Sequence, residues 1–163
     1  MPEIKTESIE FISNEKEVDK AVIDALRKAL TKVGMQAESY AKMKCPVDTG
    51  LLRNSITYAM DGDLTHIAAY ADNKGENSGT YEGKAPAEDT GLMSVTIGTN
   101  VHYAPSVELG HNQQAGRFVP ALGKRLKASW VNPKPFLRPA MEEHASEYKL
   151  ILVNEANAQM ANK

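Results

Sequence analysis

The sequence Pro135-Phe136-Leu137-Arg138-Pro139-Ala140 decides how the C-terminal part of this chain is built. Pro133 adds a third proline, and each proline fixes φ and disfavours helical geometry in the residue before it. Pro139 suits the first position of a helix, where its missing N–H costs nothing. An amphipathic run follows from Met141 to about Met160, with apolar residues at Met141, Ala145, Tyr148, Leu152 and Ala156. We therefore predict an extended segment that leads into a C-terminal helix.

A long amphipathic helix is predicted near the other end of the chain, from Glu15 to about Lys44. Apolar residues recur there at steps of three and four, at Val18, Val22, Leu26, Leu30, Val33, Ala37 and Ala41. Gly34 could bend this helix and Pro46 ends it. Residues 1–14 are predicted to form an edge strand or a mobile arm.

Short elements are predicted after this helix. Asp48 is expected to be a turn or N-cap residue, because its carboxylate can accept hydrogen bonds from N–H groups two or three residues further on. One helical turn over residues 50–53 and a strand from Ser55 to Met60 follow. The Asp61-Gly62-Asp63 sequence then predicts a hairpin whose return strand spans residues 64–70.

The second half of the chain combines polar connections with two more short elements. Residues 72–90 are polar and rich in glycine, which predicts a long loop or an extended hairpin tip. Residues 92–99 alternate apolar and polar side chains, as a half-buried strand does. Tyr103–Gly110 predicts one helical turn stopped by Gly110. Residues 111–132 predict a basic connection that is helical in part over residues 120–130.

The order of these elements predicts an α+β fold. A small antiparallel β-sheet is packed by the long N-terminal helix and the C-terminal helix, with two long loops over about residues 72–91 and 111–132. Residues 15–160 are expected to form a single domain. Because only 42% of the 163 residues are hydrophobic, we expect a thin core and some burial against partner subunits.

Charge is unevenly distributed along the chain, although the net charge is only -2. Residues 111–138 hold six basic residues and no acidic one, whereas residues 61–89 hold seven acids against two lysines. The basic residues are Arg117, Lys124, Arg125, Lys127, Lys134 and Arg138. This asymmetry favours head-to-tail contacts between identical subunits or a ring with one basic face; the bland interpretation is a solvated loop.

The cysteine count and hydropathy indicate where such a chain is made. Cys45 is the only cysteine, so no intramolecular disulfide can form and a reducing compartment is expected. The sequence has no apolar run of about 18 residues and no signal-peptide pattern. We expect a soluble protein made in a cytosol.

Two Asp-Thr-Gly triplets, at residues 48–50 and 89–91, are the strongest enzymatic signal. Aspartic proteases use two such triplets to place two carboxylates about 3 Å apart. That chemistry requires each triplet to follow an apolar strand, and neither does here. Two turns are the favoured interpretation, and an aspartic-type protease is a remote one.

Other chemistry has weaker support. Glu108 and His111 lie three residues apart, but a single pair does not define a metal site, and no Cys/His cluster occurs. Cys45 has no predictable base, and no glycine-rich phosphate loop follows a strand. Phe118 and Trp130 in the basic stretch could stack on bases. Because no recognisable nucleic-acid module is present, a basic loop that only tolerates passing DNA is favoured over sequence-specific binding. We expect no catalytic residue, metal or cofactor.

Three motifs occur in one order: residues 48–56 (DTGLLRNSI), 103–110 (YAPSVELG) and 135–140 (PFLRPA). Lying between a long helix and a C-terminal helix, they resemble the gene-product-10-like family of tailed phages over roughly residues 15–155. Members of that family are neck or tail-completion proteins at the head–tail junction.

The resemblance implies a non-catalytic virion protein in the neck or head-proximal tail, made in the host cytoplasm. It implies a homo-oligomeric ring of roughly six or twelve copies around the DNA channel. A head-closure or connector protein and a tail terminator or tail tube protein would be its partners. DNA would pass only as non-specific cargo, and no membrane is involved.

Residue roles follow from the same resemblance. The structural motif would comprise Asp48, Thr49, Gly50, Leu51, Arg53, Tyr103, Ala104, Val107, Glu108, Gly110, Pro135, Phe136, Leu137 and Pro139. Interface or channel-facing positions would be Arg117, Lys124, Arg125, Lys127 and Arg138. Charge suggests an Arg53–Glu108 ion pair, and core positions are expected at Tyr103, Val107, Leu109, Phe136 and Leu137.

Two further interpretations of the chain stay open beside the neck protein. The first is a tail terminator or another minor tail component, which only its location in the particle would distinguish. The second is a host-directed binding module, which the two long loops would suit.

Overall fold

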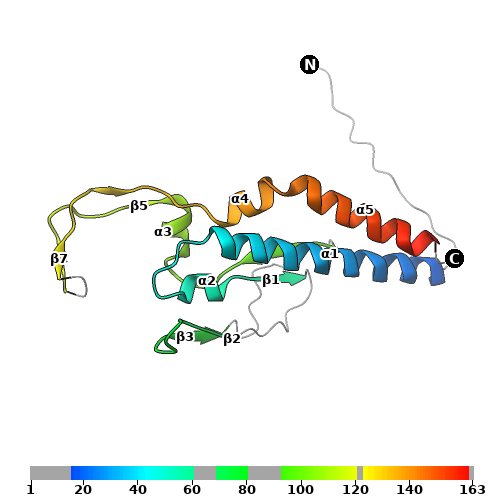
Figure 1. Cartoon of the computed structure of the whole chain (residues 1–163), viewed down its shortest axis with the longest axis horizontal. Helices are drawn as coiled ribbons and strands as arrows, with labels where there is room; N and C mark the ends of the chain where they lie inside the picture. Colours follow the sequence, from blue (N-terminus) through cyan, green and yellow to red (C-terminus); the bar gives the residue numbers. More distant parts are fainter. Residues whose placement is uncertain (1–15, 61–68, 81–92, 121–122, 162–163) are drawn as a thin grey trace, which may run out of the picture.

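The computed structural model describes residues 16–60, 69–80, 93–120 and 123–161, and it has the α+β class expected from the sequence. Helix α1 (Lys16–Lys44) forms the middle layer (Figure 1). Helices α4 (Leu137–Glu142) and α5 (Ala145–Ala161) cover one side of it, and short strands cover the other. The expected arm or edge strand at residues 1–14 lies outside the described residues.

The remaining elements are short. They are α2 (Leu51–Ser55), β1 (Thr57–Met60), β2 (Ala69–Ala71), β3 (Ser78–Thr80), β4 (Val95–Gly98), α3 (Ala104–Leu109), β5 (His111–Asn112), β6 (Phe118–Val119), β7 (Lys124–Arg125) and β8 (Trp130–Val131). Within the described ranges the strands form four separate antiparallel pairs: β1–β4, β2–β3, β5–β8 and β6–β7.

The partner of β1 differs from the prediction. Thr57 pairs with Gly98 and Met60 with Val95, so β1 is joined to β4. Of the predicted return strand over residues 64–70, only residues 69 and 70 are described, and they belong to β2, which pairs with β3. Burial explains why β1 pairs with β4, since Val95 and Ile97 of β4 pack against α1 and α5. The Asp61-Gly62-Asp63 sequence lies outside the described part of the chain.

The predicted long loop over residues 72–90 begins as an ordered hairpin. The Asp72 carboxylate accepts backbone N–H bonds from Lys74 (3.1 Å), Glu76 (2.9 Å) and Asn77 (3.2 Å), and one from the Asn77 side-chain amide (2.7 Å). The Asn77 amide and these N–H groups lower the pKa of Asp72. This turn joins β2 to β3 and fixes their register.

Helix α1 is packed through small residues. Its buried positions are Ala25, Ala29, Val33, Ala37 and Ala41, whereas Val22 and Leu26, expected on the buried face, are exposed. A Cβ at Gly34 would lie 2.6 Å from Tyr58 and 2.8 Å from Val95. Gly34 therefore allows α1 to approach β1 and β4 closely, and the helix continues past it.

The C-terminal helix is divided and begins earlier than predicted. Helix α4 starts at Leu137, so Pro139 is its third residue, a position whose N–H would still lack an intrahelical acceptor. The chain turns at Glu143–His144 before α5 begins. Met141 and Ala145 are exposed, whereas Tyr148 is buried and its hydroxyl donates to the Ala140 carbonyl (2.6 Å). Burial raises the pKa of Tyr148 to about 12.

A ribbon of two strands projects from the body, where a partly helical connection was predicted (Figure 1). We call residues 111–132 the arm. Its β5–β8 and β6–β7 pairs are linked by Gln113 N–H donating to Ser129 O (2.9 Å) and Gly116 N–H donating to Leu126 O (2.8 Å). Gly123 N–H donates to Pro120 O (3.1 Å) at the turn, and because proline and glycine are poor α-helix residues, no α-helix forms over the described part of residues 120–130.

Candidate functional site

The first motif forms a tight turn built on Gly50. Gly50 has φ of 89° and caps α2, and a Cβ there would collide with Asn73. The Thr49 hydroxyl accepts from Leu51 N–H (3.4 Å). Of the two roles expected for Asp48, the N-cap role was wrong, because Gly50 is the N-cap of α2; Asp48 is exposed in the bend that precedes it.

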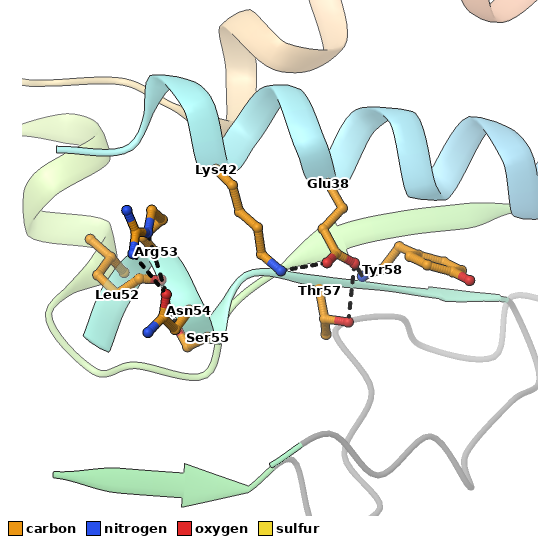
Figure 2. A network of polar contacts seen from close by, with 8 residues as sticks. All are labelled: Glu38, Lys42, Leu52, Arg53, Asn54, Ser55, Thr57 and Tyr58. Atoms are coloured by element: carbon orange, nitrogen blue, oxygen red, sulfur yellow. Dashed lines mark hydrogen bonds and ion pairs between the residues drawn. The ribbon is translucent and has the colours of Figure 1, made fainter. Parts of the chain in front are cut away.

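Side chains of α2 attach this turn to the β2–β3 hairpin. The Arg53 guanidinium donates to the side-chain oxygens of Asn54 (3.3 Å) and Asn73 (3.3 Å). Asn54 donates to the Ala71 carbonyl (2.7 Å), and Asn73 N–H donates to Thr49 O (2.9 Å). Figure 2 shows Arg53 and Asn54 together at the end of α2. The turn and the hairpin therefore form one polar unit.

Glu108 joins the second motif to the third. Its carboxylate accepts from the backbone N–H groups of Phe136 (2.7 Å), Leu137 (3.1 Å) and Arg138 (3.0 Å) at the start of α4. The carboxylate occupies the place where a helix start needs acceptors. The expected Arg53–Glu108 ion pair is not formed, because each residue has these other partners.

The core beneath these motifs includes part of the expected set. Phe136 and Ala140 are fully buried beside Leu52, Ile56 and Val101. Tyr103, Val107 and Leu137 pack against this cluster half-buried, and Ala104 is buried. Leu109, expected in the core, is 68% exposed at the end of α3. Pro135 is half-buried, and Gly110 has φ of 74° with Val131 and Pro133 close to it.

A groove of about 680 Å³ separates the first motif from the base of the arm. Its lining includes residues 46–52, Tyr103, Ser106 and Val107 of the second motif. Val131, Asn132 and Lys134 also line it. The groove is thus bounded by the first two motifs and by the segment that leads to the third.

Sequence reasoning missed Glu38. From α1 it receives the Lys42 ammonium (2.5 Å), Tyr58 N–H (3.3 Å) and the Thr57 hydroxyl (3.4 Å) (Figure 2). Glu38 therefore ties β1 to α1. In the sequence, Glu38 and Lys42 resemble an ordinary surface pair four residues apart, so no signal indicated the contact with β1.

Nucleophilic and metal chemistry has little support at this site. Burial raises the pKa of the Cys45 thiol to about 11, so the thiolate is scarce at neutral pH. No group of three or more potential metal ligands occurs among the described residues. Asp89 of the second Asp-Thr-Gly triplet lies outside them.

No helix in the described ranges is long and apolar enough to cross a membrane.

The expected interface residues lie on two parts of the chain. Arg117, Lys124, Arg125 and Lys127 are exposed along the arm, and Arg138 is exposed at the start of α4. The Arg125 guanidinium donates to the Gly116 carbonyl across the ribbon (2.8 Å). The arm therefore presents a basic surface away from the helices.

The fold and the three motifs define a small α+β protein from which a two-stranded arm projects. A family model described as "Bacteriophage HK97-gp10, putative tail-component" matches residues 9–110, and the chain belongs to this HK97 gp10-like family, as the motifs predicted. The match includes the first two motifs and ends at Gly110, so the arm and the third motif follow it. Comparisons with curated proteins and with solved structures gave no match.

Proposed function

We propose that this protein is a non-catalytic structural component of the head–tail junction, where it completes the neck or the head-proximal end of the tail. It forms a ring with copies of itself and binds connector and tail proteins around the DNA channel. Membership in a family of phage tail components carries this proposal.

Exposed apolar side chains support an assembly role. They lie on both long helices, at Val22, Ile23, Leu26, Met35, Met43, Leu150 and Val153, and Met43 is 76% exposed. Where such side chains lie together on a surface, they are typical of sites where proteins associate. A subunit that buries this surface only in a ring or against a partner would gain the burial that its thin core lacks.

The described chemistry supports a structural rather than a catalytic role. Asp48 is exposed, Cys45 is a buried thiol of raised pKa, and Glu108 is occupied by three backbone N–H groups. None of these residues is placed as an activated nucleophile or is paired with another described carboxylate. A double Asp48→Asn, Asp89→Asn variant should therefore still form particles.

Deleting the gene from its phage or prophage and imaging the particles by electron microscopy tests the position. A head–tail junction role predicts filled heads and tails of normal length that are not joined. Tails of abnormal length would indicate a tail terminator instead. Normal, infectious particles would refute both. Native mass spectrometry, alone and with the connector protein, would reveal whether the chain forms a ring.

A further inference from the structure

We propose that the arm binds double-stranded DNA through its phosphates, without reading base sequence. The proposal extends the role proposed above, in which DNA passes through the channel. DNA binding is measured on the isolated protein, whereas the junction role is tested in particles. One proposal can therefore fail without the other.

Charge sets the arm apart from the rest of the molecule. Four of the 19 basic residues lie on the arm, at Arg117, Lys124, Arg125 and Lys127, and the arm contains no acid. The rest of the chain holds the other 15 basic residues and all 21 acidic residues. Outside the arm the chain is therefore net acidic, whereas the arm itself is basic and attracts a polyanion.

The cations of the arm are available for an external partner. All four are exposed, and no ion pair joins them to another residue in the described ranges. Many described carboxylates already have partners: Glu38 with Lys42, Glu143 with Lys44, Glu155 with Lys32, and Glu108 with backbone N–H groups. Because no described carboxylate pairs with the cations of the arm, these cations can bind the phosphates of DNA.

The shape and surface of the arm fit duplex DNA. Its strands are about 5 Å apart, and the major groove of B-DNA, about 12 Å wide, admits a two-stranded ribbon. Cross-strand pairs place Phe118 beside Arg125 on one face and Val119 beside Lys124 on the other, so both faces carry a cation. A two-stranded ribbon alone is marginally stable in water, so a binding partner would order it.

Binding of a fluorescein-labelled, mixed-sequence duplex to the full-length protein tests the proposal. Four phosphate contacts predict that log K falls against log salt concentration with a slope of about -3 to -4. Affinity should fall roughly a hundredfold between about 50 and about 200 mM NaCl. Trp130 is the only tryptophan and lies on the arm, so its emission should change as DNA binds.

Two fourfold variants localise the binding. Arg117→Gln, Lys124→Gln, Arg125→Gln and Lys127→Gln together should abolish most of the affinity and flatten the salt slope. The matched control replaces exposed cations of the body, Lys20, Lys28, Lys74 and Lys149, with Gln and should keep the slope. Circular dichroism checks that both variants fold.

Several results would overturn the proposal. They are absence of salt-dependent binding by the wild-type protein, unchanged Trp130 emission with DNA, and equal loss of affinity in the two variants. Equal affinity for polyglutamate would assign the arm to an acidic protein surface. A more than tenfold preference for single-stranded DNA would assign it to base stacking rather than duplex binding.

Discussion

At the scale of single residues, Glu108 makes the most consequential contact that the sequence did not reveal. One carboxylate satisfies three N–H groups at the start of α4. Glu108→Ala should lower the free energy of unfolding by about 2 kcal/mol, because those donors lose a charged acceptor. Glu108→Gln keeps one acceptor oxygen and should cost less. Urea denaturation measures both, with exposed Glu142→Gln as control; equal stability of Glu108→Ala and wild type would contradict this role.

Phe136 and Arg138 are close in sequence but differ in what they contact. Phe136 is fully buried, so Phe136→Ala should cost about 3–5 kcal/mol of stability. Arg138 is exposed and bonds Glu108 through its backbone, so Arg138→Ala should leave stability unchanged and weaken assembly. Thermal melting and incorporation into particles separate the two effects. The opposite pattern would make this segment an interface rather than part of the core.

Asp72 should make stability depend on acidic pH. Its pKa is lowered in the folded state, so its contribution is complete above its ordinary value of 3.8 and is lost as the pH falls through the folded-state pKa. The stability difference between wild type and Asp72→Asn should be constant above about pH 5 and shrink below about pH 4. Urea midpoints across this range measure it. A difference that persists unchanged to about pH 2 would show that the Asp72 carboxylate is not stabilised by folding.

At the scale of elements, local patterns predicted the helices better than the strands. Helix α1 was predicted because its apolar period extends over many turns and Pro46 ends it. The β1–β4 pairing was not predicted, because it joins residues almost forty positions apart and depends on the burial of Val95 and Ile97. The ribbon was also missed, since its strands are two residues long and follow from the turn at Pro120 and Gly123. The Glu38 and Glu108 contacts are likewise long-range, so spacing could not reveal them.

Packing of α1 on the strands predicts an unusual effect at Gly34. Replacing a helical glycine with alanine normally stabilises a helix by about 1 kcal/mol. Here the new Cβ would lie 2.6 Å from Tyr58 and 2.8 Å from Val95, so we expect Gly34→Ala to destabilise the protein by about 1–3 kcal/mol. Chemical denaturation measures the sign, with Met35→Ala on the exposed face as control. A stabilised variant would mean that α1 does not approach β1 and β4 this closely.

At the scale of the whole molecule, the body and the arm should be separable. The described buried core contains no residue between 111 and 132, so the arm contributes little to the stability of the body. Because Gln113 and Ser129 are hydrogen-bonded across the ribbon, an Asn-Gly turn can replace residues 114–128. We expect this variant to unfold within about 1 kcal/mol of wild type, to keep its assembly mass and to lose DNA binding. Denaturation, native mass spectrometry and duplex binding measure these three properties. A loss of several kcal/mol would show that the arm belongs to the folded core, and loss of the assembled mass would assign it to contacts between subunits.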